Sequence, residues 1–427
     1  MSEWREVQIG DVCRVGDGAH AKVNRQEKGV LYLTSKNFDS GSLKLDNVDF
    51  ISEEDYEKFF PEKSKAVTKL QSNDVLIGII GTFGNAYKYK EADFFGVSSS
   101  VAIIRPQASE LNSDFLVYLL NSENFKFIHQ AYSSGSVQGY SNIPTIKSMP
   151  ITIPSLQTQE KIVSAFKPLD RKISNLRQQN ETLEAIAQTL FKHWFVDFEF
   201  PNEDGKPYKS SGGEMVRSEL GKIPEGWHIG TLEDFCNVKH GYAFKGEFIT
   251  AEETEQILLT PGNFKIGGGF NSSKYKYYSN DDYDKDYILE LGDLIITMTD
   301  LSKEGDTLGY PAFVPKHGSN IFLHNQRLGK VIDSQIVLFF LFFLLCRRDY
   351  RSHILGTASG STVRHTSPSR ILEYEFTVPN KELLDRFSLI ASNLISKNFA
   401  NYKQIETLYQ TRDVLLPKLM SGQIRII

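Results

Sequence analysis

The sequence predicts two similar α+β units, each built on a twisted and mainly antiparallel sheet, joined by two long antiparallel helices. Three observations support this architecture: an internal repeat, a heptad pattern near the middle of the chain, and a weaker copy of that pattern at its end. With 427 residues, the chain is long enough for two or more domains that each bury a core of their own.

The repeat is clearest at the end of each copy. SGSVQGYSNIPTIKSMPITIP (134–154) matches SGSTVRHTSPSRILEYEFTVP (359–379), and WREVQIGDVCRV from Trp4 resembles WHIGTLEDFCNV from Trp227. Between these matches, LTSKNF pairs with LTPGNF and NDVLIGI with GDLIITM, in the same order. The ordered matches predict two copies of one fold, related by a pseudo-twofold axis.

Short segments within each copy predict the strands. VLYLTSKNF, DVLIGIIGTFG and VSSSVAIIRP are rich in β-branched residues and bounded by turn residues. Apolar stretches at 114–120 and 337–345 predict helices. The most apolar stretch, 336–346, is expected to be a buried helix, since a membrane span needs about 20 such residues.

A heptad pattern predicts the central helix. Its apolar positions alternate in steps of four and three, which places one seam along a helix that pairs with another helix. Asn180 is the polar exception, and a buried Asn in a seam often fixes the register. Pro168 cannot donate to the helical ladder, so we expect a kink there or a helix that begins near it. The predicted seam is Ile162, Phe166, Leu169, Ile173, Leu176, Asn180, Leu183, Ala187, Leu190 and Trp194.

The distal helix repeats this pattern 225 residues later, with polar residues Asn398, Asn401 and Arg412 in its seam. The first pattern alone would also suit an ordinary core helix, but the second copy favours pairing of the two helices within the chain. The apolar seam positions of the second helix include Leu394, Ile405, Leu408 and Leu415. The predicted segments are a first domain at 1–154, a central helix at 155–199, a connector at 200–226, a second domain at 227–379 and the distal helix at 380–427.

Composition limits the class of protein. A net charge of −5 means that any nucleic-acid contact requires basic residues concentrated on one face. The three cysteines are far apart, without metal-ligand or redox spacing, so we expect buried thiols in a reducing cytosol. The N-terminal residues lack the apolar region of a signal peptide, and a cytoplasmic location is expected.

Enzyme signatures are missing from the sequence. No Gly-Lys precedes Ser or Thr as in a phosphate-binding loop. The Pro-Pro pair that the usual adenine methyltransferase motif requires is also absent. No Glu-x-Lys tripeptide of the common metal-dependent nucleases is present. The sequence therefore predicts a chain that has no catalytic site, metal or cofactor of its own.

Four stretches resemble the specificity (S) subunits of type I restriction–modification systems, and the resemblance extends over essentially the whole chain. They are IPSLQTQEKIV (153–163), ETLEAIAQTLFKHWFVDFEF (181–200), SELGKIPEGW (218–227) and LLPKLMSGQIRI (415–426). The resemblance implies two target-recognition domains that each read one half of a bipartite, asymmetric sequence of double-stranded DNA. It also implies helices that set the spacer between the half-sites and dock the partner subunits.

The partners that this resemblance implies are two methyltransferase (M) subunits and two restriction (R) subunits, with no membrane. S-adenosylmethionine, ATP and Mg²⁺ are implied as cofactors of those subunits, for adenine methylation and for ATP-dependent translocation and cleavage. A central helix of 30 residues from Leu169 spans roughly 45 Å, comparable with half-sites one DNA turn, about 34–36 Å, apart. The alternative is a scaffold with two binding domains on a coiled coil that organises protein partners and does not bind DNA.

DNA contacts require side chains that reach base edges or phosphates, and matching loops of the two repeats should face the same groove. For each residue, the alternative is a side chain that caps a turn. Trp4, Trp227, Cys13 and Cys236 are expected in the core. The candidates in the first domain are Lys36, Asn37, Tyr87, Lys88, Ser98, Ser99, Ser136, Gln138, Tyr140 and Asn142. The candidates in the second domain are Asn263, Lys265, Lys303, His324, Asn325, Gln326, Arg327, Thr362, Arg364 and His365.

Overall fold

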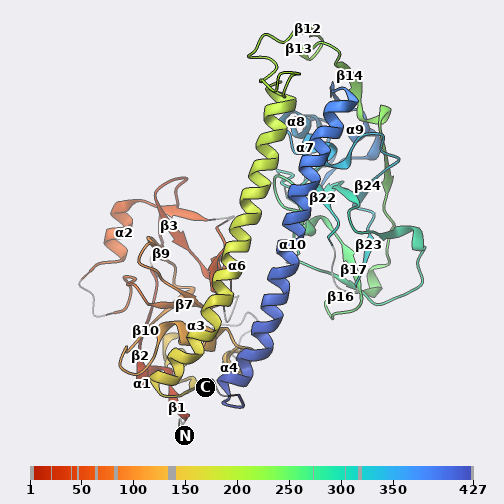
Figure 1. Ribbon diagram of the computed structural model, residues 1–427. Coiled ribbons are helices and arrows are strands. Elements are labelled where there is room, and N and C mark those ends of the chain that lie inside the picture. The colour runs from red at the N-terminus through yellow and green to blue at the C-terminus, as the bar shows by residue number, and fades with distance from the viewer. Residues whose placement is uncertain are drawn as a thin grey trace. The chain divides into compact units, whose positions relative to one another are not determined.

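The structure is a computed structural model, shown in Figure 1. It describes residues 4–20, 22–39, 41–45, 48–62, 66–80, 85–132, 141–272, 274–302, 304–315 and 320–424. The chain divides into two compact units, which are unit 1 (Met1–Leu176 with Gln404–Ile427) and unit 2 (Arg177–Lys403). Within the described ranges, no helix combines the length and the apolar character needed to cross a bilayer.

Unit 1 is an α+β domain whose sheets are mainly antiparallel. Four strands form a sheet in the order β2-β10-β7-β8, and β3 pairs antiparallel with β6 and parallel with β9. Strand β1 pairs with β11, which joins the beginning of the domain to its end. The strands are β1 (Arg5–Gln8), β2 (Cys13–Asp17), β3 (Val30–Leu33), β4 (Phe38–Asp39), β5 (Ser42–Leu43), β6 (Asp49–Ile51), β7 (Val75–Gly78), β8 (Tyr87–Lys88), β9 (Phe95–Val97), β10 (Val101–Pro106) and β11 (Pro150–Ile153). The helices are α1 (Ile9–Val12), the 3₁₀ turn η1 (Ser35–Asn37), α2 (Glu53–Phe59), α3 (Ser113–Asn121), α4 (Glu123–Tyr132), α5 (Ile143–Ser148) and the long α6 (Leu156–Phe191), which continues into unit 2.

Unit 2 repeats this topology. Its four-stranded sheet has the order β15-β24-β20-β22, β17 pairs parallel with β23, and β14 pairs with β26. The strands are β12 (Met215–Ser218), β13 (Gly221–Pro224), β14 (His228–Thr231), β15 (Asn237–His240), β16 (Ile249–Thr250), β17 (Gln256–Leu259), β18 (Tyr277–Tyr278), β19 (Ile288–Leu289), β20 (Leu294–Thr297), β21 (Thr299–Asp300), β22 (Pro311–Phe313), β23 (Ile321–His324), β24 (Leu328–Ile332), β25 (Arg364–His365) and β26 (Glu375–Val378). The helices are the π-helical turn η2 (Lys192–Val196), η3 (Leu232–Asp234), η4 (Gly246–Phe248), η5 (Pro261–Asn263), η6 (Lys285–Tyr287), α7 (Leu338–Leu345), α8 (Arg348–Thr357), α9 (Pro368–Leu372) and α10 (Lys381–Met420), which continues into unit 1. The predicted repeat and fold class are confirmed.

Each four-stranded sheet carries an ion pair at the start of one of its inner strands. In unit 1, Arg105 on β10 holds the buried carboxylate of Asp74 with bonds of 2.7 and 2.8 Å. In unit 2, the Lys330 ammonium on β24 lies 2.6 Å from the Asp293 carboxylate. Each acidic residue immediately precedes the central strand β7 or β20, so the pair ties the start of that strand to its neighbour.

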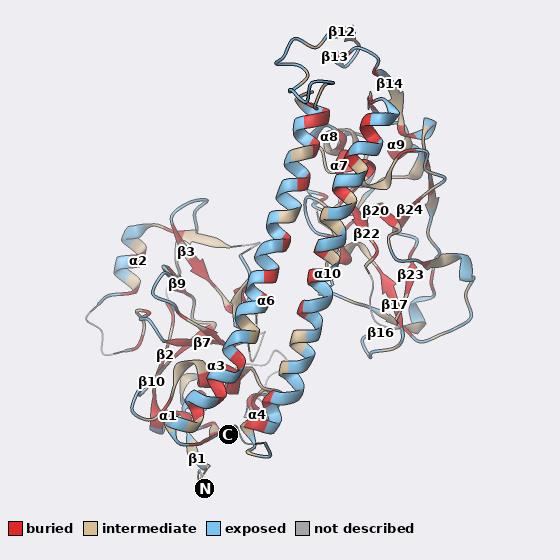
Figure 2. Ribbon diagram, in the orientation of Figure 1, coloured by how far each residue is buried: buried red, intermediate tan, exposed pale blue. Residues whose placement is uncertain are grey.

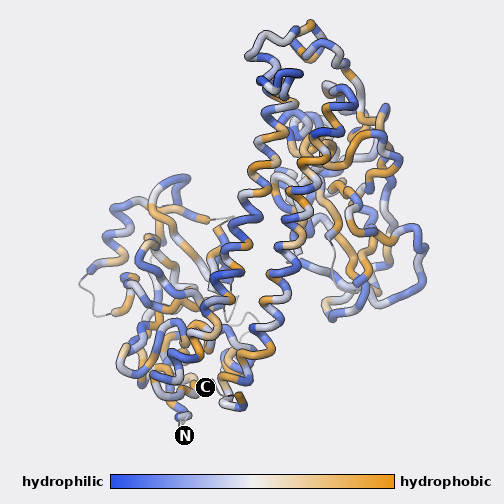
Figure 3. The backbone as a smooth tube through the Cα atoms, in the orientation of Figure 1, coloured by the Kyte–Doolittle hydropathy of each residue, from blue (hydrophilic) through white to orange (hydrophobic). Residues whose placement is uncertain are grey.

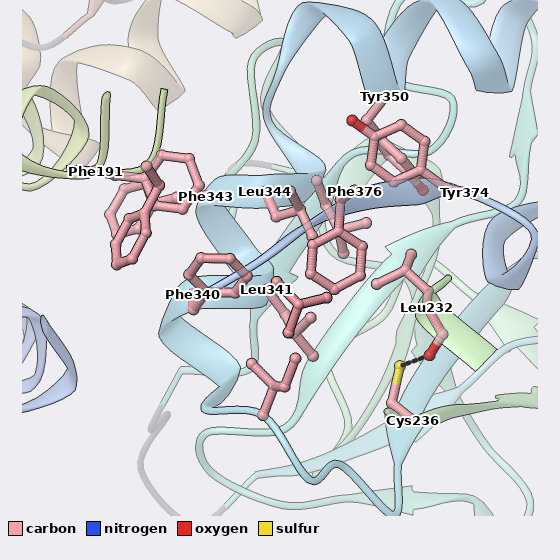
Figure 4. Close-up of a cluster of buried hydrophobic side chains, with 14 of the residues drawn as sticks. Phe191, Leu232, Cys236, Phe340, Leu341, Phe343, Leu344, Tyr350, Tyr374 and Phe376 are labelled. Carbon is pink, nitrogen blue, oxygen red and sulfur yellow. Dashed lines mark hydrogen bonds between the residues drawn. The ribbon is translucent and has the colours of Figure 1, made fainter. Parts of the chain in front are cut away.

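The core of each unit includes segments of both long helices. Ile162 and Phe166 of α6 and Leu416 and Leu419 of α10 belong to the core of unit 1. In unit 2, the cluster drawn in Figure 4 joins Phe191 at the end of α6 to α7, where Phe340 and Phe343 lie 5.4 and 5.7 Å from its ring. The apolar stretch predicted to be a buried helix is α7. Figure 2 shows buried residues along the helices and on the strands of both units.

The helices pair antiparallel within each unit. In unit 1, Asp170 of α6 faces Arg412 of α10, and Leu176 packs against Ile405. In unit 2, Asn180 bonds to Asn401, and Phe191 lies 5.9 Å from Phe387. Residue numbers therefore rise along α6 as they fall along α10. Hydrophobic and hydrophilic residues alternate along both helices in Figure 3, as the heptad pattern predicts.

The helix around Pro168 differs from the prediction. We expected a kink there or a helix that begins near it, but α6 begins at Leu156 and contains Pro168 in its interior, so the predicted start is wrong. Pro168 and Ser164 are both exposed, so the Ser164 carbonyl that loses its helical partner faces solvent. Because solvent can satisfy an exposed carbonyl, a proline at this position need not end the helix.

The seam of α10 also needs a correction. Leu415 is 36% exposed, whereas its neighbour Leu416 is 6% exposed and belongs to the core of unit 1. Leu183 and Leu190 of α6 are only half-buried, in contrast to Ile173 and Leu176. The remaining seam positions are buried or half-buried: Leu169, Trp194, Leu394 and Leu408.

The predicted connector has a structure of its own. Strands β12 and β13 form an antiparallel hairpin. The ring of Phe200 stacks on Tyr208 at 4.5 Å and on Trp227 at 5.6 Å, which attaches the connector to the core of unit 2. Trp227, Cys13 and Cys236 are buried, as expected, whereas Trp4 and Cys346 are only half-buried. Burial raises the pKa of Cys13 to about 12 and that of Cys236 to about 11, which keeps both thiols protonated.

Candidate nucleic-acid interface

Three segments meet at one place in unit 2, which we call the junction of unit 2. The first is the turn 325–327 between β23 and β24, the second is Met298 after β20, and the third is the end of the Gly-Ser loop at Thr366. The Met298 amide donates to the Arg327 carbonyl at 2.8 Å, and the Thr366 amide donates to the Met298 carbonyl at 3.0 Å. Strand β21, which follows Met298, pairs with β25 of the Gly-Ser loop.

Unit 1 has the same junction. The turn 98–100 between β9 and β10 takes the place of 325–327, and Ile79 takes the place of Met298. The Ile79 amide donates to the Ser100 carbonyl at 2.9 Å, and the Ser141 amide donates to the Ile79 carbonyl at 3.0 Å. The backbone is thus repeated, whereas the side chains differ between the units.

A glycine brings a fourth segment against each turn. Gly241 follows β15, and a Cβ on it would lie 2.1 Å from the Asn325 carbonyl oxygen. Gly18 follows β2, and its Cβ would lie 2.0 Å from the Val97 carbonyl oxygen. Any larger residue would push the strand away from the turn. The residues after these glycines, Tyr242 and Ala19, are therefore held at the junction.

The exposed side chains at the junction of unit 2 suit DNA contacts. Gln326 and Arg327 are exposed, and neither side chain has a hydrogen-bond partner among the residues that the structure describes. Across β21, His365 is exposed and its Nδ1 lies 3.2 Å from the hydroxyl oxygen of Thr299. Arg364, paired with Asp300 in the strand register, is half-buried. Thr362 is exposed in the same loop.

Asp300 shapes the segment between β21 and β22. Its carboxylate accepts hydrogen bonds from the amides of Ser302 (2.7 Å) and Thr307 (2.5 Å) and from the Thr307 hydroxyl (2.6 Å). Burial would raise the pKa of Asp300, but these hydrogen bonds hold it below its usual value. The carboxylate is therefore occupied within the protein and serves to fix the loop.

Two of the predicted DNA contacts, Asn37 and Asn263, cap turns within the protein. Asn37 is buried, and its side chain accepts from the Thr34 amide at 2.9 Å and donates to the Lys44 carbonyl at 3.0 Å. Asn263 is fully buried, and its Oδ1 accepts from the Thr260 amide at 2.8 Å. The repeated motifs LTSKNF and LTPGNF therefore encode a turn, because the Asn side chain satisfies backbone groups that would otherwise be unpaired.

The side chains of Tyr87 and Lys88 also have partners within the protein. Tyr87 is buried, and its hydroxyl donates to Asp93 at 2.8 Å. Burial and this bond raise the pKa of Tyr87. The Lys88 ammonium lies 2.5 Å from the carboxylate of Asp114 on α3. Neither residue belongs to the junction of unit 1.

His324 and Asn325 support the turn in unit 2. His324 is 1% exposed, and its Nε2 lies 3.0 Å from the Leu328 carbonyl oxygen. Burial lowers the pKa of His324 to about 4, so the imidazole is neutral at physiological pH and attracts no phosphate. The Asn325 side chain is buried and accepts from the Arg327 amide at 2.9 Å.

The serines of unit 1 divide into two roles. The Ser98 hydroxyl lies 2.6 Å from that of Ser100, so it holds the turn. The Ser99 amide donates to the Ala19 carbonyl at 3.1 Å, and its half-buried hydroxyl has no partner among the described residues. Lys36 is exposed beside Ser35, whose hydroxyl donates to the Ile80 carbonyl near this junction.

The remaining candidates lie elsewhere or outside the description. Asn142 is exposed, and its Oδ1 caps α5 by accepting from the Thr145 amide at 2.8 Å. Lys265 is exposed and interacts with the Tyr402 hydroxyl on α10, which places it beside the helix and not at the junction. Ser136, Gln138, Tyr140 and Lys303 lie outside the described residues.

The sequence analysis missed Tyr242 and His240, which flank Gly241. Both side chains are exposed. A comparison of Asp17-Gly18-Ala19 with His240-Gly241-Tyr242 would have found them, because the offset of 223 residues is the same as that between Trp4 and Trp227. No group of three or more potential metal ligands occurs in the parts of the chain that the structure describes.

Comparisons with known proteins agree with this architecture. Residues 1–185 and 224–405 match the family described as type I restriction modification DNA specificity domain. The chain is 26% identical to the type I restriction enzyme HindI specificity subunit of Haemophilus influenzae, over 99% of this chain and 100% of that protein. It is 30% identical to the MjaIX specificity subunit of Methanocaldococcus jannaschii, over 74% of this chain and 69% of that protein.

A solved structure shares the fold. The type I restriction–modification S subunit from M. genitalium superposes with a TM-score of 0.52 at 15% identity, over 98% of this chain and 96% of that one. Two repeated α+β units with paired long helices are thus the fold of a specificity subunit. The chain belongs to the type I restriction–modification DNA specificity family.

Proposed function

We propose that this chain selects the DNA target of a type I restriction–modification complex, and that each unit reads one half of a bipartite sequence. One observation carries the proposal: the two junctions have the same backbone hydrogen bonds but different side chains. A shared frame with different contact groups suits an asymmetric target, because side chains determine which base edges are recognised. Unit 2 has the exposed Gln326 and Arg327 where unit 1 has the half-buried Ser99 and Ser100.

The test uses the full chain with its methyltransferase partner. Methylated sites are mapped across a host genome, and duplexes with the mapped site are titrated at several salt concentrations. We expect a split, asymmetric motif and an affinity that falls steeply with salt, since phosphate contacts release counterions. An affinity independent of both sequence and salt would favour the protein scaffold instead.

We further propose that α6 and α10 set the spacer between the half-sites. Both helices are unbroken across the boundary between the units, and each contributes to both cores. Four residues inserted after Thr182 add roughly 6 Å of rise. The mapped spacer should grow by one or two base pairs with both half-sites retained. An active variant with an unchanged spacer would refute this role.

The outward faces of these helices are proposed to dock the methyltransferase (M) and restriction (R) subunits. The side chains of Leu389 (68% exposed) and Ile186 (48%) in unit 2, and of Val414 (57%) in unit 1, are apolar but exposed. Contacts with partner subunits would remove this surface from water. Leu389→Ser should weaken assembly with the M subunit and leave the thermal stability of the isolated chain unchanged. If the variant assembles with the M subunit as wild type does, this face is not the docking surface for that subunit.

The chemistry is proposed to reside in the partners. S-adenosylmethionine would serve the M subunits, and ATP with Mg²⁺ the R subunits. The chain then supplies position and specificity without touching the reacting atoms. The isolated chain, incubated with DNA and these cofactors, should neither methylate nor cleave it, and activity from the purified chain would overturn this assignment.

A further inference from the structure

Tyr242 is an exposed aromatic residue at the junction of unit 2 that the sequence-based predictions did not include. It is 37% exposed although it follows a strand and precedes the buried Phe244. Its hydroxyl has no hydrogen-bond partner within the part of the chain that is described. A tyrosine next to the turn that carries Gln326 and Arg327 offers a donor, an acceptor and an apolar ring edge at the junction.

The backbone of Tyr242 is fixed on both sides. Its amide donates to the His324 carbonyl at 2.9 Å, and its carbonyl accepts from the Gln326 amide at 2.8 Å. The ring is supported as well, at 5.1 Å from Phe244 and 5.1 Å from Tyr287. A side chain held in this way loses little conformational entropy on binding, which favours its use as a contact residue.

The first repeat shows that the fold does not require an aromatic residue here. Ala19 occupies the equivalent position, and its amide and carbonyl make the same two bonds, with Val97 at 2.9 Å and Ser99 at 3.1 Å. Ala19 is 8% exposed. Because the junction of unit 1 forms around alanine, the tyrosine of unit 2 is available for a role other than folding.

We propose that Tyr242 is a specificity-determining residue, which contacts one base pair of the half-site read by unit 2 through its hydroxyl and ring edge. The inference rests on the proposed function. Tyr242 adds to Gln326 and Arg327 a contact that unit 1 lacks. The difference between Tyr242 and Ala19 is then one physical source of the asymmetry of the target.

The experiment compares Tyr242→Ala and Tyr242→Phe with wild type, each as the full chain with its methyltransferase partner. Methylated motifs are mapped, and affinities are measured for duplexes that carry the wild-type site. Leu291→Ala is the matched control, because Leu291 is 60% exposed but precedes β20, at the opposite end of that strand from Met298. The half-site of unit 2 is identified as the one that Arg327→Gln alters.

Tyr242→Ala should accept additional bases at one position of that half-site and bind the wild-type duplex about tenfold more weakly, the scale of one lost base contact. Tyr242→Phe should relax the same position with a loss of about fivefold, as expected for one hydrogen bond. The other half-site should remain as in wild type, and Tyr242→Phe, which keeps the ring contacts with Phe244 and Tyr287, should also keep the wild-type melting temperature.

Two results would overturn the inference. In the first, the Tyr242→Ala complex methylates the wild-type motif and binds the wild-type duplex within twofold of the wild-type affinity. In the second, Tyr242→Ala changes only the half-site that Arg327→Gln leaves intact. Both are distinct from failure of the proposed function, in which the wild-type complex itself shows no sequence-specific methylation.

Discussion

The side-chain amide of Asn401 on α10 donates a 2.9 Å hydrogen bond to the side-chain oxygen of Asn180 on α6. Both residues are buried, at 1% and 3% exposure. Asn398, the next polar seam residue of α10, donates to Glu184 at 3.2 Å. The polar seam positions that weaken the second heptad pattern thus meet polar groups of the first helix. Such a layer favours one register of the helix pair over others.

Asn401→Leu removes the donor and leaves the buried oxygen of Asn180 without its partner. We expect a loss of about 1–3 kcal/mol in the free energy of unfolding. Asn180→Leu with Asn401→Leu removes both groups and should be more stable than either single variant. Denaturant unfolding gives the free energy of unfolding of Asn180→Leu, Asn401→Leu and the double variant. Additive losses in the double variant would show that the two amides act independently.

The adjacent residues Leu415 and Leu416 provide a matched pair. Leu416→Ala leaves a cavity in the core of unit 1 and should cost about 2–5 kcal/mol. Leu415→Ala changes an exposed side chain and should cost less than about 1 kcal/mol. Thermal unfolding of both variants tests the corrected register. Equal losses of stability in the two variants would show that Leu415 is a buried seam residue, as the sequence predicted.

His324 predicts a pH dependence of stability. Burial lowers its pKa from 6.5 to about 4, so the folded state favours the neutral imidazole. This contribution is fully present above pH 6.5 and is lost as the pH falls from 6.5 towards 4. His324→Gln should therefore flatten the decline of unfolding free energy across that window. The control is His228→Gln, an exposed histidine. An unchanged slope in His324→Gln would show that the imidazole titrates normally in the folded protein.

Arg327 and Lys88 should differ in their effect on DNA binding, although both were predicted as contacts. Arg327 is exposed at the junction of unit 2, whereas Lys88 is paired with Asp114. Arg327→Gln should weaken binding of the cognate duplex by about 1–3 kcal/mol. Lys88→Gln should leave both affinity and salt dependence unchanged. Equilibrium titrations at several salt concentrations measure the two quantities, and the reverse ranking would place the interface elsewhere.

The Asp170 carboxylate on α6 is a second polar contact between the helices, within unit 1. It accepts a hydrogen bond from Tyr118 on α3 and lies 3.8 Å from the Arg412 guanidinium. Burial raises the pKa of Asp170, while Tyr118 and Arg412 oppose that rise. Arg412, a polar exception in the predicted seam, is therefore used to join α10 to α6 and, through Asp170, to α3.

The sequence by itself determined the repeat, the two long helices and most of their seam. These features follow from local periodicity and from matches between the copies, and both are properties of the order of residues. The buried helix α7 could be predicted for the same reason, since its apolar residues have no polar face. The matches between the copies also predicted reading residues in equivalent loops, and that prediction stays a proposal.

Only the tertiary structure decided which polar side chains remain free for a ligand. Asn37 and Asn263 looked like base-reading residues, yet their amides satisfy buried backbone groups from other segments. Leu415 and Leu416 are adjacent in sequence, and only packing against the core of unit 1 shows which one is buried. The role proposed for Tyr242 depends on the close approach of Gly241 to the turn 325–327, which only the structure shows. In each case the outcome depends on contacts between segments distant in the chain, and local sequence does not record such contacts.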